Sequence, residues 1–282
     1  MELDEKKTIE LAMAGDKHAL ESLIRSVQDR IYGLSLKMLY QPPDAEDATQ
    51  EILIKIVTRL DSFRQASAFS TWALKIASNH LLNKRKYFLR WQFTFKSCED
   101  MIVRDIPDQT TVLYSEAEQE LVLEEMRISC MQGLLQCLDW DHRLVYILGE
   151  TMDVTGTEGA AILDIKPSAF RKRLSRSRKR IRDFLSRNCE MYSEGNPCKC
   201  ASQAAAAIKN GYMDPVRLQY AKPRESKGKR IDAQERIRLM EGLSRQAALM
   251  RYHPDYMAPE AFIQGIREML DSGKFNKLRN LH

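Results

Sequence analysis

Hydrophobic residues recur at steps of three and four positions along most of the chain, which is the spacing of amphipathic helices. The segment 16–38 shows this spacing most clearly, with apolar residues at Leu20, Leu23, Ile24, Val27, Ile31, Leu34 and Met38. Alternation of apolar and polar residues, expected for half-buried strands, is scarce. The pattern therefore predicts an all-α protein.

A second helix is expected after a proline pair that interrupts the first pattern. Asp44 follows this pair and carries a side chain suited to an N-cap. One apolar stripe then continues to Phe63 through Ala45, Ala48, Ile52, Ile56 and Leu60. A short loop at 64–69 separates this helix from a third one, predicted over 71–86 with Ser70 as its cap.

Periodicity disappears between residues 98 and 115, where acidic residues and Pro107 interrupt the sequence. This composition is typical of an interdomain linker. Helical spacing resumes from Val122, and after Arg187 the sequence becomes loop-like and rich in cysteine. These changes predict a first helical domain at 1–97, a linker at 98–115, a second domain at 116–187 and an extension at 188–282.

The segment 157–181 has the layout of a helix-turn-helix. A short apolar helix precedes Asp164, a residue that tolerates the left-handed backbone of a tight turn, and Pro167 suits the first turn of a second helix. That second helix keeps Phe170 and Leu174 for the core and is otherwise rich in arginine and lysine. A helix of this kind fits the major groove, with its N-terminal residues at base edges and its cations near phosphates. A solvated basic helix, or one that binds membranes or proteins, is the alternative.

Charge is distributed unevenly, although the formal net charge is only +5. Residues 166–187 contain ten lysines or arginines and one acid, whereas 116–125 contain five glutamates and no base. No apolar run approaches the length of a membrane helix, and the charged N-terminus does not resemble a signal peptide, so a cytoplasmic protein without membrane insertion is expected. No phosphate loop, catalytic triad or paired carboxylates appear, so no enzymatic activity is expected.

The segment 44–86, DAEDATQEILIKIVTRLDSFRQASAFSTWALKIASNHLLNKRK, resembles region 2 of bacterial RNA polymerase sigma factors of the extracytoplasmic-function group. The helix-turn-helix resembles their region 4.2, with Gly159, Asp164 and Lys166 in place of the usual aliphatic residue, turn glycine and hydroxyl cap. The resemblance implies a subunit that binds core RNA polymerase, recognises two promoter elements and promotes transcription initiation. It implies a polymerase-binding surface formed by Asp44, Asp47, Gln50 and Glu51, although acids in a first helical turn also complement the helix dipole.

Two groups of residues are the candidate DNA contacts. Melted DNA is held by aromatic faces beside a cationic groove, and the family captures a flipped base of the minus-ten element with the loop at 64–68 and the helix after it. The candidates there are Arg64, Phe69, Lys75, Asn79, Lys84 and Arg85, with Trp72 assigned to the core. The candidates for the minus-thirty-five element are Ser168, Arg171, Lys172, Arg173, Arg176 and Arg178.

The extension lies beyond the part that resembles the family. Cys189, Cys198 and Cys200 have C-x8-C-x-C spacing, and with His253 they are candidate ligands of a tetrahedral zinc ion. The pair Cys198 and Cys200 could instead act as a redox sensor, or all three cysteines could be reduced and unligated. We expect the extension to regulate activity in cis, so that deleting residues 188–282 changes promoter-dependent transcription. An anti-sigma factor is a further expected partner.

Two alternative functions remain open from the sequence. A helix-turn-helix repressor or activator that acts without core polymerase would explain 157–181, but would leave the acidic helix and aromatic loop of the first domain unused. A cysteine-based metal or redox sensor carrying a DNA-binding module would explain the cysteines. The second alternative predicts bound metal or a reversible disulfide, with function lost on Cys198→Ser.

Overall fold

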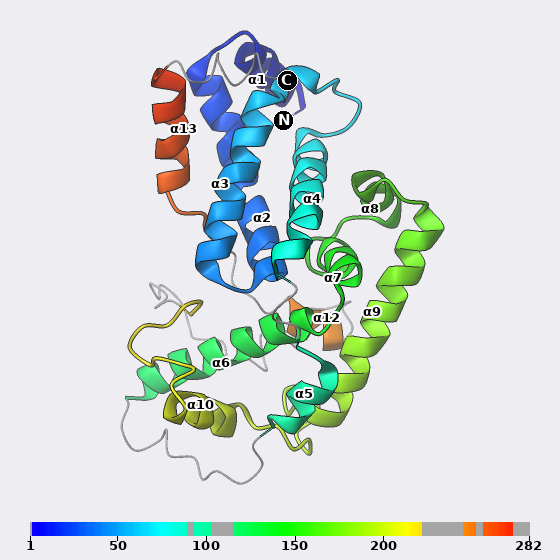
Figure 1. The fold of residues 1–282 in the computed structure, drawn as a ribbon, viewed down its shortest axis with the longest axis vertical. Helices are drawn as coiled ribbons and strands as arrows, with labels where there is room; N and C mark the ends of the chain where they lie inside the picture. The colour runs from blue at the N-terminus through cyan, green and yellow to red at the C-terminus, as the bar shows by residue number, and fades with distance from the viewer. Residues whose placement is uncertain (1, 89–92, 103–114, 222–244, 252–255, 273–282) are drawn as a thin grey trace. The chain divides into compact units, whose positions relative to one another are not determined.

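The computed structural model describes residues 2–88, 93–102, 115–221, 245–251 and 256–272 (Figure 1). These residues form helices and no β-strand, apart from one isolated parallel β-bridge between Cys189 and Cys198. The predicted all-α class is therefore confirmed. Contacts divide the chain into two units. The first comprises 1–89, 157–167 and 255–282, and the second comprises 90–156 and 168–254.

The first unit is built from three packed helices with shorter helices beside them. Its helices are α1 (Glu2–Met13), α2 (Lys17–Leu39), α3 (Pro42–Thr58), α4 (Phe69–Phe88), α8 (Gly156–Leu163) and α13 (Ala261–Asp271), and a 3-10 turn, η1 (Leu60–Ser62), follows α3. The predicted stripes meet in a core that is shielded from solvent. Its fully buried side chains include Ile24, Ile31, Leu34, Ile52, Ile56 and Leu74.

Helix α2 begins one residue after the start of the predicted segment, and the Asp16 side chain caps it by accepting a hydrogen bond of 2.8 Å from the Ala19 amide. Two predicted caps are wrong. Helix α3 begins at Pro42 with Gln41 as its N-cap, so Asp44 lies inside the first turn. Proline is accommodated there because the first helical amides have no intrahelical acceptor. Helix α4 begins at Phe69, which places Ser70 within the helix and ends the preceding loop earlier than predicted.

The second unit contains the remaining helices. They are α5 (Phe95–Asp100), α6 (Glu116–Gln136), α7 (Trp140–Tyr146), a π-helical turn η3 (Ile147–Thr151), α9 (Pro167–Asn188), α10 (Cys200–Lys209) and α12 (Arg245–Met250). Helix α5 occupies part of the predicted linker, because Thr94 and Ser97 form a reciprocal capping box at its start. The predicted linker residues 103–114 lie outside the described part of the chain.

Two buried charged side chains, Arg143 and Glu125, form hydrogen bonds with backbone groups of the second unit. The Arg143 side chain is buried and donates to the Leu135, Gln136 and Leu138 carbonyls at 2.9, 3.0 and 3.0 Å, which satisfies the C-terminal end of α6. Burial lowers the pKa of this guanidinium to about 10. The buried Glu125 carboxylate accepts three amide hydrogen bonds, of 2.7 to 2.9 Å, from residues 219–221. The chain that follows α10 is therefore tied to α6.

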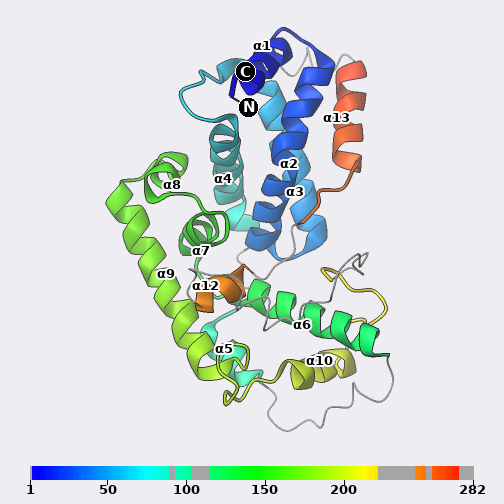
Figure 2. The same ribbon diagram turned by 180° about the vertical axis from the view of Figure 1, so that it is seen from behind.

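The predicted extension contributes to both units. Helix α10 lies alongside α6 (Figures 1 and 2), where Ala204 packs with Val122 and Met213. Helix α13 instead belongs to the first unit, next to α2. Within the described residues, no helix is long and apolar enough to cross a membrane.

Candidate nucleic-acid interface

Helix α3 presents polar residues in its first three turns. Asp47, Gln50 and Glu51 are exposed and Asp44 is half-buried, while Ala45 and Ala48 between them are fully buried. Residues three and four apart share one side of a helix, so Asp44, Asp47 and Glu51 lie on one face of α3. This is the surface that the sequence predicted for the polymerase.

Glu51 is part of a charged cluster between α3 and α4. Its carboxylate lies 2.7 Å from Lys84 Nζ and 3.5 Å from His80 Nε2. Burial raises the pKa of Glu51, but the hydrogen bond from Lys84 and the nearby positive charges lower it overall. Lys55 Nζ lies 2.6 Å from His80 Nδ1, so the neutral ring accepts this hydrogen bond. Burial, followed by the charge of Lys55, lowers the pKa of His80 to about 4.

Three aromatic rings support the loop before α4. Phe63 and Phe69 meet edge to face with centroids 5.7 Å apart, and Trp72 lies 5.2 and 5.7 Å from them. Phe69 is only 2% exposed, and Trp72 is half-buried. An enclosed ring cannot stack on a base without leaving its cluster, so in this conformation Phe69 holds the loop from inside. Its predicted DNA contact stays a prediction.

The loop and the outer face of α4 carry the exposed polar candidates. Residues 64–68 are all exposed, and Gln65 adopts a left-handed φ of +52° within this loop. Lys75 and Asn79 are exposed one helical turn apart, and Arg85 is exposed further along the helix. The structure therefore places Arg64, Lys75, Asn79 and Arg85 on accessible surface, whereas Lys84 is engaged with Glu51.

The predicted helix-turn-helix is present as α8, a tight turn and α9. Asp164 adopts the left-handed conformation expected of it, with φ of +53°, and the Ile165 amide donates to the Ala160 carbonyl at 3.0 Å. Helix α9 then begins at Pro167 and buries Phe170 and Leu174. Most of its candidate DNA contacts point to solvent: Ser168, Arg171, Lys172 and Arg176 are exposed, and Arg173 is half-buried.

Arg178 differs from the other cations of α9 because its guanidinium forms an ion pair with Glu150, a buried residue of η3. The Glu150 carbonyl also accepts a hydrogen bond of 2.6 Å from Arg251. Nothing in the spacing of the basic helix distinguishes Arg178 from its neighbours. The partner was missed because Glu150 lies 28 residues earlier in the chain.

The cysteines give no assembled metal centre in the part of the chain that the structure describes, where no group of three or more possible ligands is arranged to hold an ion. His253, the fourth predicted zinc ligand, lies outside the described residues. Burial raises the pKa of Cys198 to about 12 and that of Cys200 higher still. Both are therefore thiols at neutral pH in this conformation, whereas zinc binds thiolates.

A different pair of cysteines is close, and the sequence analysis did not find it. Cys98 of α5 and Cys137 at the end of α6 have sulfur atoms 3.3 Å apart. Both cysteines are half-buried. No local sequence signal joins two cysteines 39 positions apart.

A model of a known protein family matches part of the α2–α4 region. The Sigma-70 region 2 family model matches residues 23–88. Over 190 residues the chain is 28% identical to the ECF RNA polymerase sigma factor SigW of Bacillus subtilis (strain 168), covering 66% of this chain and 98% of that protein. Over 193 residues it is 28% identical to the ECF RNA polymerase sigma-E factor of Escherichia coli (strain K12), covering 64% of this chain and 93% of that protein.

Among solved structures, the chain is similar to the sigma factor RpoE from Bartonella quintana, crystallised in complex with the anti-sigma factor NepR. The TM-score is 0.43 and the sequence identity is 19%, over 58% of this chain and 94% of that one.

Proposed function

We infer that the chain is an RNA polymerase sigma factor of the extracytoplasmic-function group, with a C-terminal extension beyond the part that its relatives share. It acts in transcription initiation by binding core RNA polymerase and promoter DNA. The observation that carries this inference is the match of residues 23–88 to Sigma-70 region 2, since these residues form the helices that present both the acidic surface and the aromatic-supported loop.

The polymerase-binding surface that we propose consists of Asp44, Asp47, Gln50 and Glu51 on α3. Three of these residues are exposed, and the buried alanines between them fix the helix against the core. Asp44 lies in the first turn of α3, where the helix dipole favours a carboxylate, so the fold needs no partner to retain this residue. Their common face gives a partner with basic residues a surface of complementary charge.

The proposed minus-ten reader is the loop 64–68 with the exposed face of α4. Arg64, Lys75, Asn79 and Arg85 provide cations and an amide on accessible surface. The contact between Phe63 and Phe69 joins the two ends of this loop. Capture of an unpaired base would offset the few kcal/mol that its extrusion costs, and so favour strand opening.

The proposed minus-thirty-five reader is the N-terminal half of α9. Ser168, Arg171 and Lys172 are exposed in its first two turns, where a recognition helix meets base edges. Arg176 lies further along and is placed to contact phosphate. Catalysis belongs to the polymerase, so we propose no enzymatic role for this chain and locate it with the polymerase in the cytoplasm. An anti-sigma factor remains a further proposed partner.

Reconstitution with sigma-free core polymerase tests this function directly. The holoenzyme is used to select initiating sequences from a promoter library, because the promoter is not known in advance. We expect selection of two conserved elements by the wild-type chain. Asp47→Arg is expected to lose core binding, and Lys75→Glu to keep core binding but lose strand opening. Lys209→Glu, an exposed change on α10, is the control and keeps both.

The same experiment separates the alternatives. A stand-alone regulator would bind duplex DNA without polymerase and would be insensitive to Asp47→Arg, an outcome that contradicts the sigma function. A metal sensor would carry zinc at Cys189, Cys198 and Cys200 when purified from zinc-containing medium. Metal content of the wild-type chain and of Cys198→Ser decides this point.

A further inference from the structure

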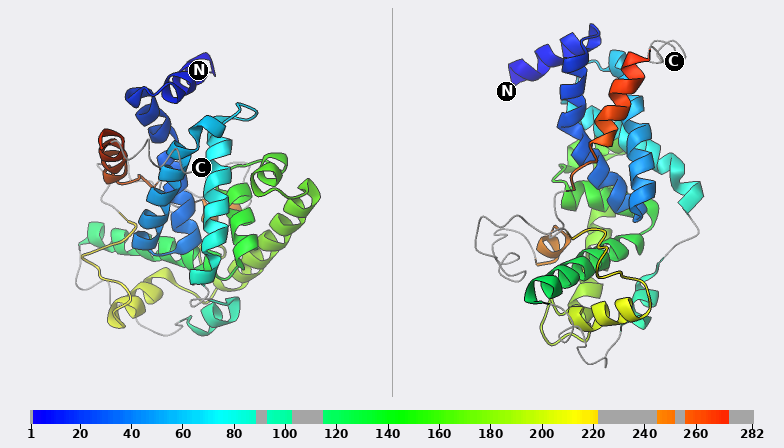
Figure 3. Two further views of the ribbon diagram at one scale, coloured as in Figure 1. Left: turned by 45° about the horizontal axis from the view of Figure 1, so that its top comes forward. Right: turned by 90° about the vertical axis from the view of Figure 1, so that its left-hand side faces the viewer.

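The C-terminal residues 256–271 run along one stripe of α2, in the opposite direction to that helix. The positions that they meet recur every fourth residue, so neighbouring positions lie one turn apart along a slanting ridge of α2. These positions are Lys17, Glu21, Arg25, Asp29, Gly33 and Lys37. Figure 3 shows α13 beside α2 and α3 in the first unit. The segment therefore contacts α2 along a continuous surface and not at a single point.

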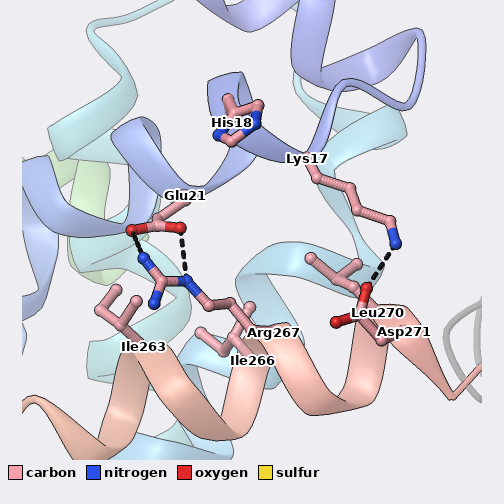
Figure 4. Close-up of a pocket in the computed structure, with 8 residues that line it drawn as sticks. All are labelled: Lys17, His18, Glu21, Ile263, Ile266, Arg267, Leu270 and Asp271. Atoms are coloured by element: carbon pink, nitrogen blue, oxygen red, sulfur yellow. Dashed lines mark hydrogen bonds and ion pairs between the residues drawn. The ribbon is translucent and has the colours of Figure 1, made fainter.

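Charges along the two helices alternate in complementary order. Asp271 lies 2.5 Å from Lys17 Nζ, and Arg267 donates two hydrogen bonds, of 2.7 and 2.6 Å, to Glu21 (Figure 4). One turn of α2 further on, Arg25 donates two, of 3.0 and 3.1 Å, to Glu260. The hydrogen bonds from Arg267 and then Arg25 lower the pKa of Glu21 to about 2. A shift by one turn would oppose like charges, so the sequence specifies this register.

Apolar contacts lie beneath the ion pairs. Phe262, Ile263 and Ile266 are buried, at spacings that form one stripe of α13. The Phe262 ring meets Tyr32 edge to face with centroids 6.0 Å apart. Ile263 and Ile266 also line the cleft between the two helices that Figure 4 shows. Helix α13 is thus an amphipathic helix seated on α2.

The seated helix also reaches α3, where the proposed polymerase-binding surface lies. At Gly265 a Cβ atom would stand 3.3 Å from Gln50 Nε2. Gln50 is one of the four residues assigned to the polymerase, and glycine lets the backbone of α13 come close to it. A protein that docks over Gln50 would meet α13 in the same space.

We propose that residues 256–271 are an internal competitor of core polymerase, which occupies α2 beside Gln50 until the polymerase displaces it. This proposal rests on the proposed sigma function and names the regulation of the same surface. A tethered segment competes at an effective concentration in the millimolar range, so it needs little intrinsic affinity. The acids of two of its ion pairs are largely exposed, Glu260 by 76% and Asp271 by 68%, so these two pairs add little and the segment remains displaceable.

The test uses the full-length chain and alters only the C-terminal segment. Glu260→Arg combined with Arg267→Glu preserves net charge and sets like charges against Arg25 and Glu21. Lys6→Glu combined with Glu10→Arg makes the same kind of exchange between exposed residues of α1 and is the matched control. Hydrogen exchange of 261–271 reports whether the helix is released, and titration with core polymerase gives the affinity.

We expect the Glu260/Arg267 variant to show faster hydrogen exchange over 261–271. Because the competing segment is released, the variant should also bind core polymerase at least about threefold more tightly, which corresponds to about 0.65 kcal/mol. The control should match the wild type in both measurements. Phe262→Arg, which removes the apolar anchor, is the second variant and should act in the same direction. A released helix with unchanged or weaker core binding overturns the proposal. If neither the wild type nor any variant binds core polymerase, the sigma function itself is overturned. This result differs from the failure of the competitor proposal, in which the wild type still binds.

Discussion

Glu51 of α3 and Lys84 of α4 form an ion pair of 2.7 Å, which joins a residue assigned to the polymerase to one assigned to promoter DNA. Lys84 is the less exposed partner, with 23% of its side chain accessible against 51% for Glu51. His80 lies 3.5 Å from the same carboxylate. The residues that the sequence predicted for polymerase and for DNA therefore share a side-chain contact, and a substitution in one set changes the charge that the other presents.

The first prediction is that Glu51 and Lys84 act as a coupled pair. In a double-mutant cycle with Glu51→Gln and Lys84→Gln, core affinity should be non-additive by about 0.5 kcal/mol, the usual size for a partly exposed pair. Lys75→Gln, on the exposed face of α4, provides the control cycle and should be additive with Glu51→Gln. Additivity in both cycles would mean that Lys84 acts on DNA independently of Glu51.

The second prediction separates two arginines of α9. Arg171 is exposed, whereas Arg178 is paired with the buried Glu150. Arg171→Ala should weaken holoenzyme binding to the minus-thirty-five element, by about 1–3 kcal/mol if it reads a base, with little change in thermal stability. Arg178→Ala should instead lower the midpoint of thermal unfolding, because it leaves Glu150 buried without its partner.

Promoter binding and thermal unfolding of the two variants decide this assignment. Arg178→Lys keeps the charge and should recover part of the stability, since lysine provides a single point charge in place of the guanidinium fork. An Arg178→Ala variant of wild-type stability with reduced promoter affinity would return Arg178 to the DNA-contacting set.

The sequence predicted the helices that are long and strongly periodic. Helix α2 and the turn at Asp164 agree with the prediction, because local side-chain and backbone preferences decide both. The predicted start of α3 was wrong because Pro42 also fits a first helical turn. The preference of aspartate for the N-cap and that of proline for the first turn therefore indicated different starts. Helix α5 was missed because six residues give too short a pattern to detect.

The sequence could predict only those features of the candidate sites that depend on the spacing of nearby residues. Spacing indicated which faces of α3, α4 and α9 carry charge, and the exposure of Lys75 and Arg171 agrees with it. Spacing could not show that Arg178 is held by Glu150, or that Glu260 and Arg267 pair with α2. Those contacts join residues far apart in the chain and depend on tertiary packing. Charges at Lys17, Glu21 and Arg25 were a possible signal, but their partners lie more than 230 residues away.

The third prediction concerns acid sensitivity at His80. Its pKa in the folded chain is about 4, below the ordinary value of 6.5, so between these values the unfolded chain binds the proton more readily. Stability therefore falls as pH decreases from about 6.5 to 4, and this contribution does not change further below 4. His80→Asn retains an acceptor for Lys55 without the titration. Thermal unfolding at several pH values should show a flatter profile for the variant, and identical slopes would contradict the assignment.

The fourth prediction is that mild oxidation joins Cys98 to Cys137. Their sulfur atoms are 3.3 Å apart, and the hydrogen bond with Cys137 lowers the pKa of Cys98, which favours the thiolate that begins the reaction. With diamide as oxidant, two thiols would form one disulfide while diamide accepts two electrons and two protons. Peptide mapping after alkylation should recover the 98–137 bridge. Cys98→Ser should abolish it and Cys130→Ser should not. A disulfide confined to Cys189 and Cys198, which form an isolated β-bridge, would show that this pair reacts first, and would contradict this prediction.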